Sequence, residues 1–355
     1  MSRFFKHTIP TLFFVASTAI LPAKDSKMME GLKQSASQGD ADAQLCVGCF
    51  HFYGVETKKD ELESAKWIRK AAEQGNPIAQ YYLGFFHYYG IGVKKDYIEA
   101  ARWYRKSGDQ GYALGRYSLA ICYDEGHGVW KSHSKAAQLY RLAAEQGNAR
   151  AQINYGICYI EGKGVKKDAV EGVKWIRMAA EKGFAPAQSN LGLCYDKGIG
   201  VQKDDAEAAK WYLKAAEKGD LAAQNNLGFC YEKGLGVKKD PSKAVHWYMR
   251  ASQQGDSLAL TNLGDCLRRG QGVKKDLVEA YARFVVAESD HPRAKEFLKQ
   301  TAAKMNPEQI AKGSLRAKQL MEEIRKTTLE KNKPVPIYEG LLEQKPEALK
   351  PSNQS

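Results

Sequence analysis

Two cysteines stand close together near the start of the chain, Cys46 and Cys49 in the segment CVGC. Redox proteins use this spacing, and a helix N-terminus, where we expect the segment to lie, lowers the pKa of a thiol. A thioredoxin-like site also needs a βαβ pattern around the motif, and the sequence shows none. Two interpretations stay open: a redox or disulfide role, or two small apolar side chains.

The other five cysteines recur every 36 residues, at Cys122, Cys158, Cys194, Cys230 and Cys266. Such a series suggests cross-links, but equivalent helices pack about 8–10 Å apart. A disulfide needs Cα atoms closer than about 7 Å. We therefore expect small, buried, apolar side chains at these positions.

Further candidates for chemistry are weak. His51 and His87 occupy equivalent places and could share a metal, but later repeats carry tyrosine there, so tyrosine substitution is the favoured interpretation. Ser132 and Lys135 form an S-x-x-K match without the K-T-G that accompanies it in acylating enzymes. No paired carboxylates, phosphate loop or catalytic triad can be recognised. We predict no catalytic residue, no metal and no cofactor.

The elements that carry these residues repeat. Glycines recur every 36 residues from Gly39 to Gly255 and again from Gly54 to Gly270, which defines seven units over residues 40–291. Each unit predicts two helices: an apolar stripe that ends at paired glycines, then a second helix that begins at an aspartate such as Asp240. One such pair cannot bury its own apolar face, so we predict an all-α solenoid of seven stacked 36-residue helix pairs.

The segment AAKWYLKAAEKGDLAAQNNLGFCYEKGLGVKKD resembles the Sel1-like repeat, a relative of the tetratricopeptide repeat. The resemblance covers about residues 40–291 and implies a right-handed superhelix that acts as a protein-interaction scaffold or adaptor, without a cofactor. Cysteine-rich relatives, some with β-lactamase labels, staple each helix pair with two cysteines, whereas this chain has one per repeat. A secreted enzyme or redox protein is therefore the alternative.

Several segments depart from the repeat. The third unit has the loop GHGVWKSHSK, which indicates either sequence drift or a kink or special loop that presents Trp130. Residues 24–39 and 292–326 are predicted to form capping helices, the second pair broken at Asn306-Pro307. Residues 327–355 hold four prolines and no sustained period, which predicts a disordered tail.

Charge and the N-terminus bear on the partner. The formal net charge is +13, and lysine pairs recur in the loop between the two helices of most units. Residues 1–23 have a basic start, an apolar stretch and small residues at the end, the pattern of a signal peptide for export to the periplasm or outside the cell. We expect no membrane span and no nucleic-acid partner, but a weak attraction to anionic envelope polymers.

The predicted binding surface lies on the first helices. At 100° per residue, the face opposite the core stripe in the first unit contains Leu45, Cys49 and Phe52. Apolar side chains on the equivalent face of early units, beside a row of asparagines, would suit an extended peptide. The alternative is that both sets serve packing between helix pairs. The predicted groove consists of Tyr81, Phe85, Tyr88, Tyr117, Ile121, Asn154, Ile157, Asn190, Asn226 and Asn262.

Overall fold

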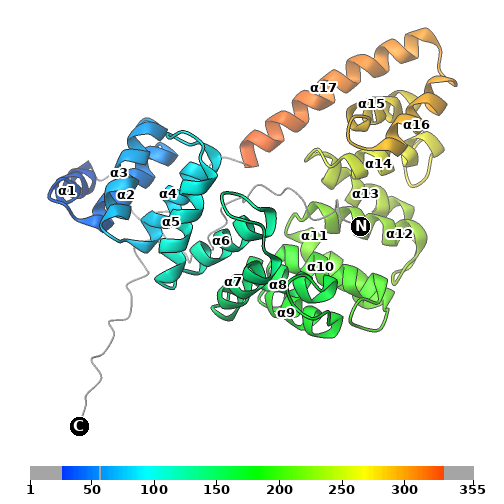
Figure 1. Cartoon of the computed structure of the whole chain (residues 1–355). Coiled ribbons are helices and arrows are strands. Elements are labelled where there is room, and N and C mark those ends of the chain that lie inside the picture. Colours follow the sequence, from blue (N-terminus) through cyan, green and yellow to red (C-terminus); the bar gives the residue numbers. More distant parts are fainter. Residues whose placement is uncertain (1–25, 56, 332–355) are drawn as a thin grey trace. The chain divides into compact units, whose positions relative to one another are not determined.

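The computed structural model describes residues 26–55 and 57–331 (Figure 1). Over these residues it contains seventeen helices and no strand, so the predicted all-α fold is confirmed. The first helices of the seven pairs are α2 (Ala41–Tyr53), α4 (Pro77–Tyr89), α6 (Ala113–Glu125), α8 (Ala149–Glu161), α10 (Ala185–Lys197), α12 (Leu221–Lys233) and α14 (Ser257–Arg269). The second helices are α3 (Glu61–Glu73), α5 (Tyr97–Asp109), α7 (His133–Glu145), α9 (Ala169–Glu181), α11 (Asp205–Glu217), α13 (Pro241–Ser252) and α15 (Leu277–Ala287).

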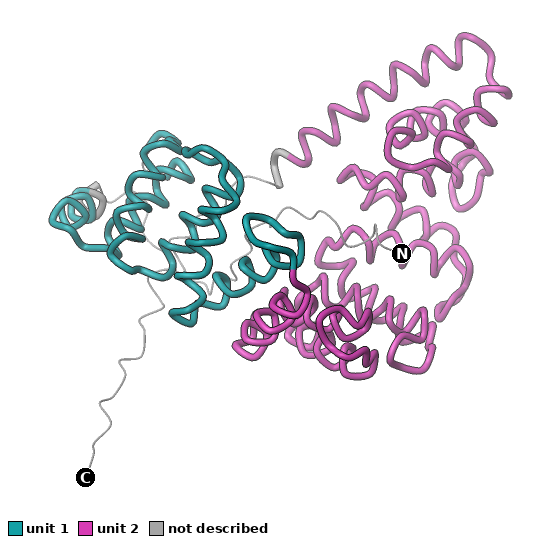
Figure 2. The backbone as a smooth tube through the Cα atoms, viewed as in Figure 1, with its two compact units in different colours: residues 1–131, 332–355 teal, residues 132–331 magenta. Residues whose placement is uncertain are grey.

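The chain divides into two compact units (Figure 2). Unit 1 contains α2–α6 and α1 (Ser26–Ser37), and unit 2 extends from Ser132 to Lys331. The division falls inside the unusual loop of the third repeat, between α6 and α7. That loop does present Trp130, whose side chain is 95% exposed.

The helix ends follow from local chemistry. Asp240 accepts a hydrogen bond from Lys243 N, and Pro241 occupies the first turn of α13. Ser132 fills the same capping position for α7 and accepts from Lys135 N, which gives the S-x-x-K match a structural role. Every first helix ends at a glycine in the left-handed conformation, with φ between 64 and 80°.

Glycines also set the distance between neighbouring elements. A Cβ on Gly228 would lie 2.7 Å from the Tyr248 ring, so this mid-helix glycine allows α12 and α13 to approach closely. Gly236, in the following loop, has φ +66°, and a Cβ there would come within 2.5 Å of Ala206 N and closer still to Asp205 O. The loop of one repeat therefore lies directly on the first turn of the second helix of the preceding repeat.

A row of buried glutamines joins successive helices, which the sequence analysis did not identify. Gln224 Nε2 donates a hydrogen bond of 3.0 Å to Ala216 O at the end of α11. Because the last carbonyls of a helix have no partner within it, this bond caps the helix. Equivalent bonds are made by Gln44, Gln80, Gln152 and Gln188. In the third repeat Arg116 replaces the glutamine, and its Nε donates to Gly108 O at 2.9 Å.

Two further helices, α16 (Pro292–Ala302) and α17 (Pro307–Lys331), follow the seventh pair. Asn306 and Gln309 exchange backbone-to-side-chain hydrogen bonds at the start of α17. The helix packs along α15, where Arg316 Nε donates to Glu279 Oε1 at 2.6 Å. Residues 327–331 were predicted to belong to a disordered tail, and this is wrong, because α17 continues through them.

The remaining part of that predicted tail, residues 332–355, and the predicted signal segment, residues 1–23, lie outside the described residues. Among the helices of residues 26–331, none is both long enough and apolar enough to cross a membrane.

Candidate functional site

One side of α8 is left partly uncovered by the packing. In α8, Arg150, Asn154, Ile157 and Glu161 follow one another at helical spacing and are at least partly exposed. The intervening side chains, such as Tyr155 and Cys158, are buried. The same positions in the other repeats form what we call the first-helix face, and most of them are at least partly exposed, although Cys49, Tyr82 and Asp265 are buried.

The first helices are packed on from several directions within each unit. In unit 2, α10 contacts its own second helix α11, the preceding second helix α9 and the neighbouring first helices α8 and α12. Successive second helices of unit 2 contact each other less extensively than α10 contacts α8 and α12. In this part of unit 2, first helices therefore lie nearer to one another than second helices do.

Seven of the ten predicted groove residues lie on this face and are partly exposed: Phe85, Ile121, Asn154, Ile157, Asn190, Asn226 and Asn262. The other three do not lie on it. Tyr117 shares the helical position of Tyr81 one repeat later and is half-buried, whereas Tyr88 belongs to a different side of α4.

Tyr81 is only 6% exposed, so its prediction as a surface residue is wrong. Its ring packs on Tyr104 and Tyr112, with centroids 5.9 and 5.7 Å away. The helical wheel placed this position opposite the core because it assumed that each first helix packs against a single neighbour. A first helix in a stack meets at least three, which widens its buried arc; Leu45, Ile153, Ser189, Asn225 and Thr261 are buried at equivalent positions.

Tyr88 takes part in an aromatic cluster instead. Its hydroxyl is 2.8 Å from His127 Nδ1, and the His127 ring stacks on Tyr97 with a centroid distance of 4.5 Å. These contacts fix the third-repeat loop on the start of α5. Tyr88 therefore positions the loop that carries Trp130.

Two asparagines of the predicted row already donate hydrogen bonds within the chain. Asn190 Nδ2 donates to Pro186 O at 2.9 Å, and Asn262 Nδ2 donates to Asn225 Oδ1 at 2.9 Å. The Asn190 bond lies within α10, whereas the Asn262 bond joins α14 to α12. The role of these amides toward a partner stays a prediction.

Phe229 was missed by the sequence analysis. It lies on the first-helix face of α12 and is 44% exposed, with Lys233 Nζ 5.6 Å from the ring centroid. The later repeats were interpreted as polar on this face because of residues such as Glu232. The 36-residue period was the available signal, because it connects the apolar residues Phe85, Ile121, Ile157, Leu193 and Phe229.

None of the seven cysteines forms a disulfide, and the five periodic ones are buried, as predicted. Burial raises the pKa of Cys122 to about 12. Burial, with a smaller effect of Asp42 and Asp40, raises the pKa of Cys46 to about 11. Because the thiolate is the reactive form, the CVGC segment is poorly suited to redox chemistry at neutral pH.

His87 makes the contact that a tyrosine makes in the next repeat, in keeping with the tyrosine interpretation. Arg69 Nη2 lies 3.3 Å from His87 Nε2, and the equivalent arginine in the next repeat, Arg105, donates to the Tyr123 hydroxyl at 3.0 Å. Burial, and then the charge of Arg69, lower the pKa of His87. Over the described residues, no group of three or more histidine, cysteine, aspartate or glutamate side chains is placed to hold a metal ion.

The comparisons with known proteins agree with this architecture. The Sel1 repeat pattern matches seven consecutive segments, residues 41–76, 77–112, 113–148, 149–184, 185–220, 221–256 and 257–282. The chain belongs to the Sel1 repeat family. The family prediction made from the repeat segment is thus confirmed.

Among solved structures, a Sel1 repeat protein from Oxalobacter formigenes is 31% identical over 78% of this chain and 82% of its own, with a TM-score of 0.63. A protective antigen present in uropathogenic Escherichia coli strains is 25% identical over 92% of this chain and 99% of its own, with a TM-score of 0.36. An immunity protein from Pseudomonas aeruginosa is 21% identical over 66% of this chain and 84% of its own, with a TM-score of 0.41. No curated protein sequence matches the chain.

Proposed function

We propose that this Sel1 repeat protein is a non-catalytic scaffold that binds a segment of a partner protein on its first-helix face. The observation that carries the proposal is the composition of that face. Apolar side chains stay partly exposed there at one position of successive repeats, and Phe229 is 44% exposed. In repeats four to six an asparagine stands one turn before the apolar residue and offers a donor and an acceptor to a main chain.

The chemistry of the thiols favours a scaffold over a redox enzyme. A reactive cysteine needs a lowered pKa, and burial raises the pKa of both Cys46 and Cys49. The pKa of Cys194 is likewise raised to about 12 by burial. The buried cysteines therefore act as core side chains, in keeping with a binding role.

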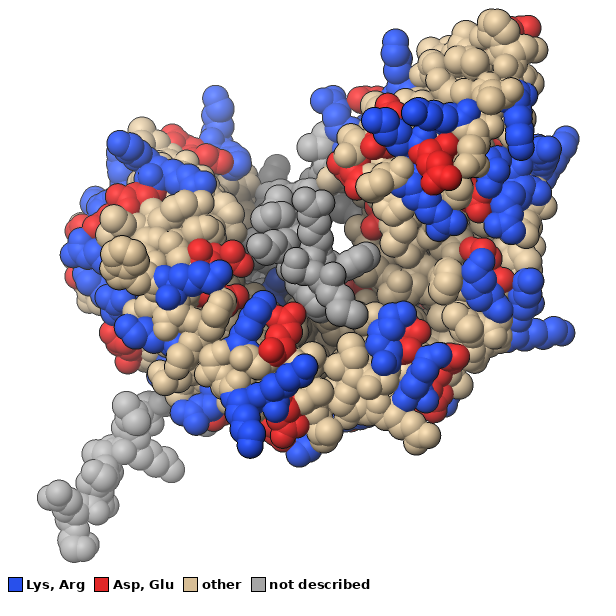
Figure 3. Space-filling model, turned by 45° about the vertical axis from the view of Figure 1, so that its right-hand side comes forward, with Lys and Arg blue, Asp and Glu red and all other residues tan. Residues whose placement is uncertain are grey.

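A weak attraction to anionic polymers belongs to the same proposal. Lys166, Lys238 and Lys274 are exposed in equivalent loops, and the described residues place no carboxylate at ion-pair distance from them. Figure 3 shows Lys and Arg side chains spread over the visible surface with Asp and Glu between them. The attraction should therefore be diffuse and sensitive to salt.

Export through residues 1–23 is also part of the proposal. The supporting observation is their signal-peptide pattern, with cleavage options after Ala19 and Ala23. Expression in a bacterial host, followed by fractionation and N-terminal sequencing, tests it. A mature chain that begins at Ile20 or Lys24 outside the cytoplasm is expected, and a cytoplasmic chain that retains Met1 would contradict export.

Paired substitutions test the binding face. Phe85→Ser with Phe229→Ser removes two side chains of the first-helix face, and Val170→Ser with Met178→Ser removes two exposed apolar side chains of α9. A partner captured from envelope extracts by the wild-type chain should be lost with the first pair and kept with the second. Equal loss with both pairs would refute the assignment of the face.

A further inference from the structure

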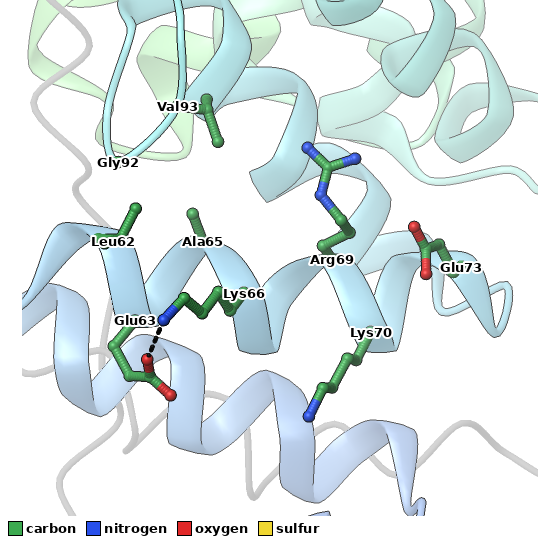
Figure 4. A pocket seen from close by; sticks show the side chains of 9 residues that line it. All are labelled: Leu62, Glu63, Ala65, Lys66, Arg69, Lys70, Glu73, Gly92 and Val93. Atoms are coloured by element: carbon green, nitrogen blue, oxygen red, sulfur yellow. Dashed lines mark hydrogen bonds and ion pairs between the residues drawn. The ribbon is translucent and has the colours of Figure 1, made fainter.

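Unit 1 has a second feature, a pocket of about 410 Å³ on the side of α3 (Figure 4). Leu62, Ala65 and Arg69 line it from α3, and Val93 faces them from the loop that follows α4. The side chain of Leu62 is 59% exposed. The pocket lies on a second helix and its neighbouring loop, and none of its lining residues belongs to the first-helix face.

The next repeat has the same set of residue types one period later. Ile98, Ala101 and Arg105 stand on α5, and Val129 follows Gly128 in the third-repeat loop. Ile98 is 63% exposed. A Cβ on Gly128 would lie 2.6 Å from Ile98 N, so the loop is seated on the first turn of α5.

Trp130 extends from this seated loop. Its side chain is 95% exposed, although burial of a tryptophan contributes more than burial of most residues. The base of the loop is fixed, because His127 stacks on Tyr97 and contacts the Tyr88 hydroxyl. An exposed tryptophan on an ordered base is typical of an anchor residue at a protein interface.

Positive charge accompanies these apolar side chains. The guanidinium groups of Arg69 and Arg105 are held by His87 and Tyr123, and neither has a carboxylate partner among the described residues. Lys94 and Lys131 are exposed in the two loops. Of the acidic pocket residues, Glu63 is paired with Lys66 at 2.9 Å, and Glu73 lies at the end of the pocket beyond Arg69.

We propose that this edge of unit 1, formed by Leu62, Arg69, Ile98, Arg105 and Trp130, binds an acidic amphipathic helix of a partner protein. The bound helix lies across α3 and α5, so that apolar side chains on one of its faces meet Leu62 and Ile98. Its carboxylates meet the two arginines. Trp130 covers the end of the bound helix.

The observations favour a polypeptide over other anionic partners. Leu62 and Ile98 are aliphatic and have no polar group for sugar hydroxyls, which disfavours an acidic polysaccharide. A membrane surface would require a broad apolar plane, and the exposed apolar side chains here are separated by charged ones. The binding differs in surface and in partner chemistry from that of the first-helix face.

The test uses the full chain and a tryptophan-free peptide of about 18 residues, with leucines along one helical face and glutamates on the flanking positions. Trp130 is the most exposed large apolar side chain of the described residues, so its coverage should shift the emission of the protein to shorter wavelength. Saturable binding is expected. Ile98→Ser and Trp130→Phe should each weaken it about tenfold, and Trp130→Phe should also remove the shift.

Val170→Ser is the matched control, since Val170 is 56% exposed at the position equivalent to Ile98 in unit 2, and Phe229→Ser reports on the first-helix face. Both should leave peptide binding unchanged, and the second keeps this proposal separable from the proposed function. Absence of binding at about 1 mM peptide would overturn the inference. So would equal binding of a peptide with lysine in place of glutamate, or an equal shift with phosphatidylglycerol vesicles or polygalacturonate.

Discussion

Replacing Gly236 with alanine should open the contact between the fifth and sixth repeats. An alanine at φ +66° loses about 1–2 kcal/mol, because left-handed backbone strains any residue with a Cβ. The new methyl would also overlap Asp205 O and lie 2.5 Å from Ala206 N, both backbone atoms that cannot rotate away. Overpacking of this kind costs about 1–3 kcal/mol more.

Gly219→Ala provides the matched control. Its φ of +89° imposes a similar strain, but no atom lies within 4 Å of its Cβ position. Urea unfolding followed by circular dichroism should show Gly219→Ala destabilised by about 1–2 kcal/mol. Gly236→Ala should be destabilised by roughly 2–5 kcal/mol.

A smaller midpoint shift for Gly236→Ala than for Gly219→Ala would refute the reasoning. It would mean that the loop does not bear on α11 and that the paired glycines serve turn conformation alone. An equal shift would show the same. The comparison therefore separates the packing role of Gly236 from its conformational role.

Three further predictions follow from single contacts. Gln224→Ala should lower the free energy of unfolding by about 0.5–1.5 kcal/mol, measured by urea titration, because the side-chain hydrogen bond to Ala216 O is lost while that carbonyl keeps its bond from Gly219 N. The native chain at pH 8 should react slowly with a thiol reagent, with rapid modification of all seven cysteines only after denaturation, since burial raises the pKa of Cys46 to about 11. Burial alone would raise the pKa of Glu279, but hydrogen bonds from Arg283 and Arg316 lower it overall. The stability that these two arginines give through Glu279 should be complete above the ordinary pKa of glutamate and lost as pH falls through the lowered pKa of Glu279. Proteolysis of α17 should therefore increase in acid. Glu279→Gln should remove this pH dependence.

The fold could be predicted because its signals are local and repeated. Asp240 before Pro241, the glycine pair after each first helix and the 36-residue period each specify an element boundary without knowledge of distant contacts. The end of α17 was misplaced because Pro334 and Pro336 suggested an earlier change in structure than the one at Lys331.

The candidate site was predicted only in part, because exposure depends on how many neighbours a helix has. A wheel drawn for one helix placed Tyr81 on the surface, whereas the stack buries it against Tyr104 of α5 and Tyr112, the residue before α6. Phe229 escaped notice because polar neighbours in its own repeat concealed the period. The contacts that seat the Trp130 loop involve residues up to 39 positions apart, which the motif pattern does not encode.

The binding role of the first-helix face is tested most directly by a photo-crosslinking residue introduced at Phe229. Met178 is the matched position, since it is 43% exposed on α9 and Phe229 is 44% exposed on α12. After irradiation in the native host, a defined partner protein should be crosslinked from position 229 and not from position 178. No crosslinked protein at position 229, or the same products at both positions, would contradict the account.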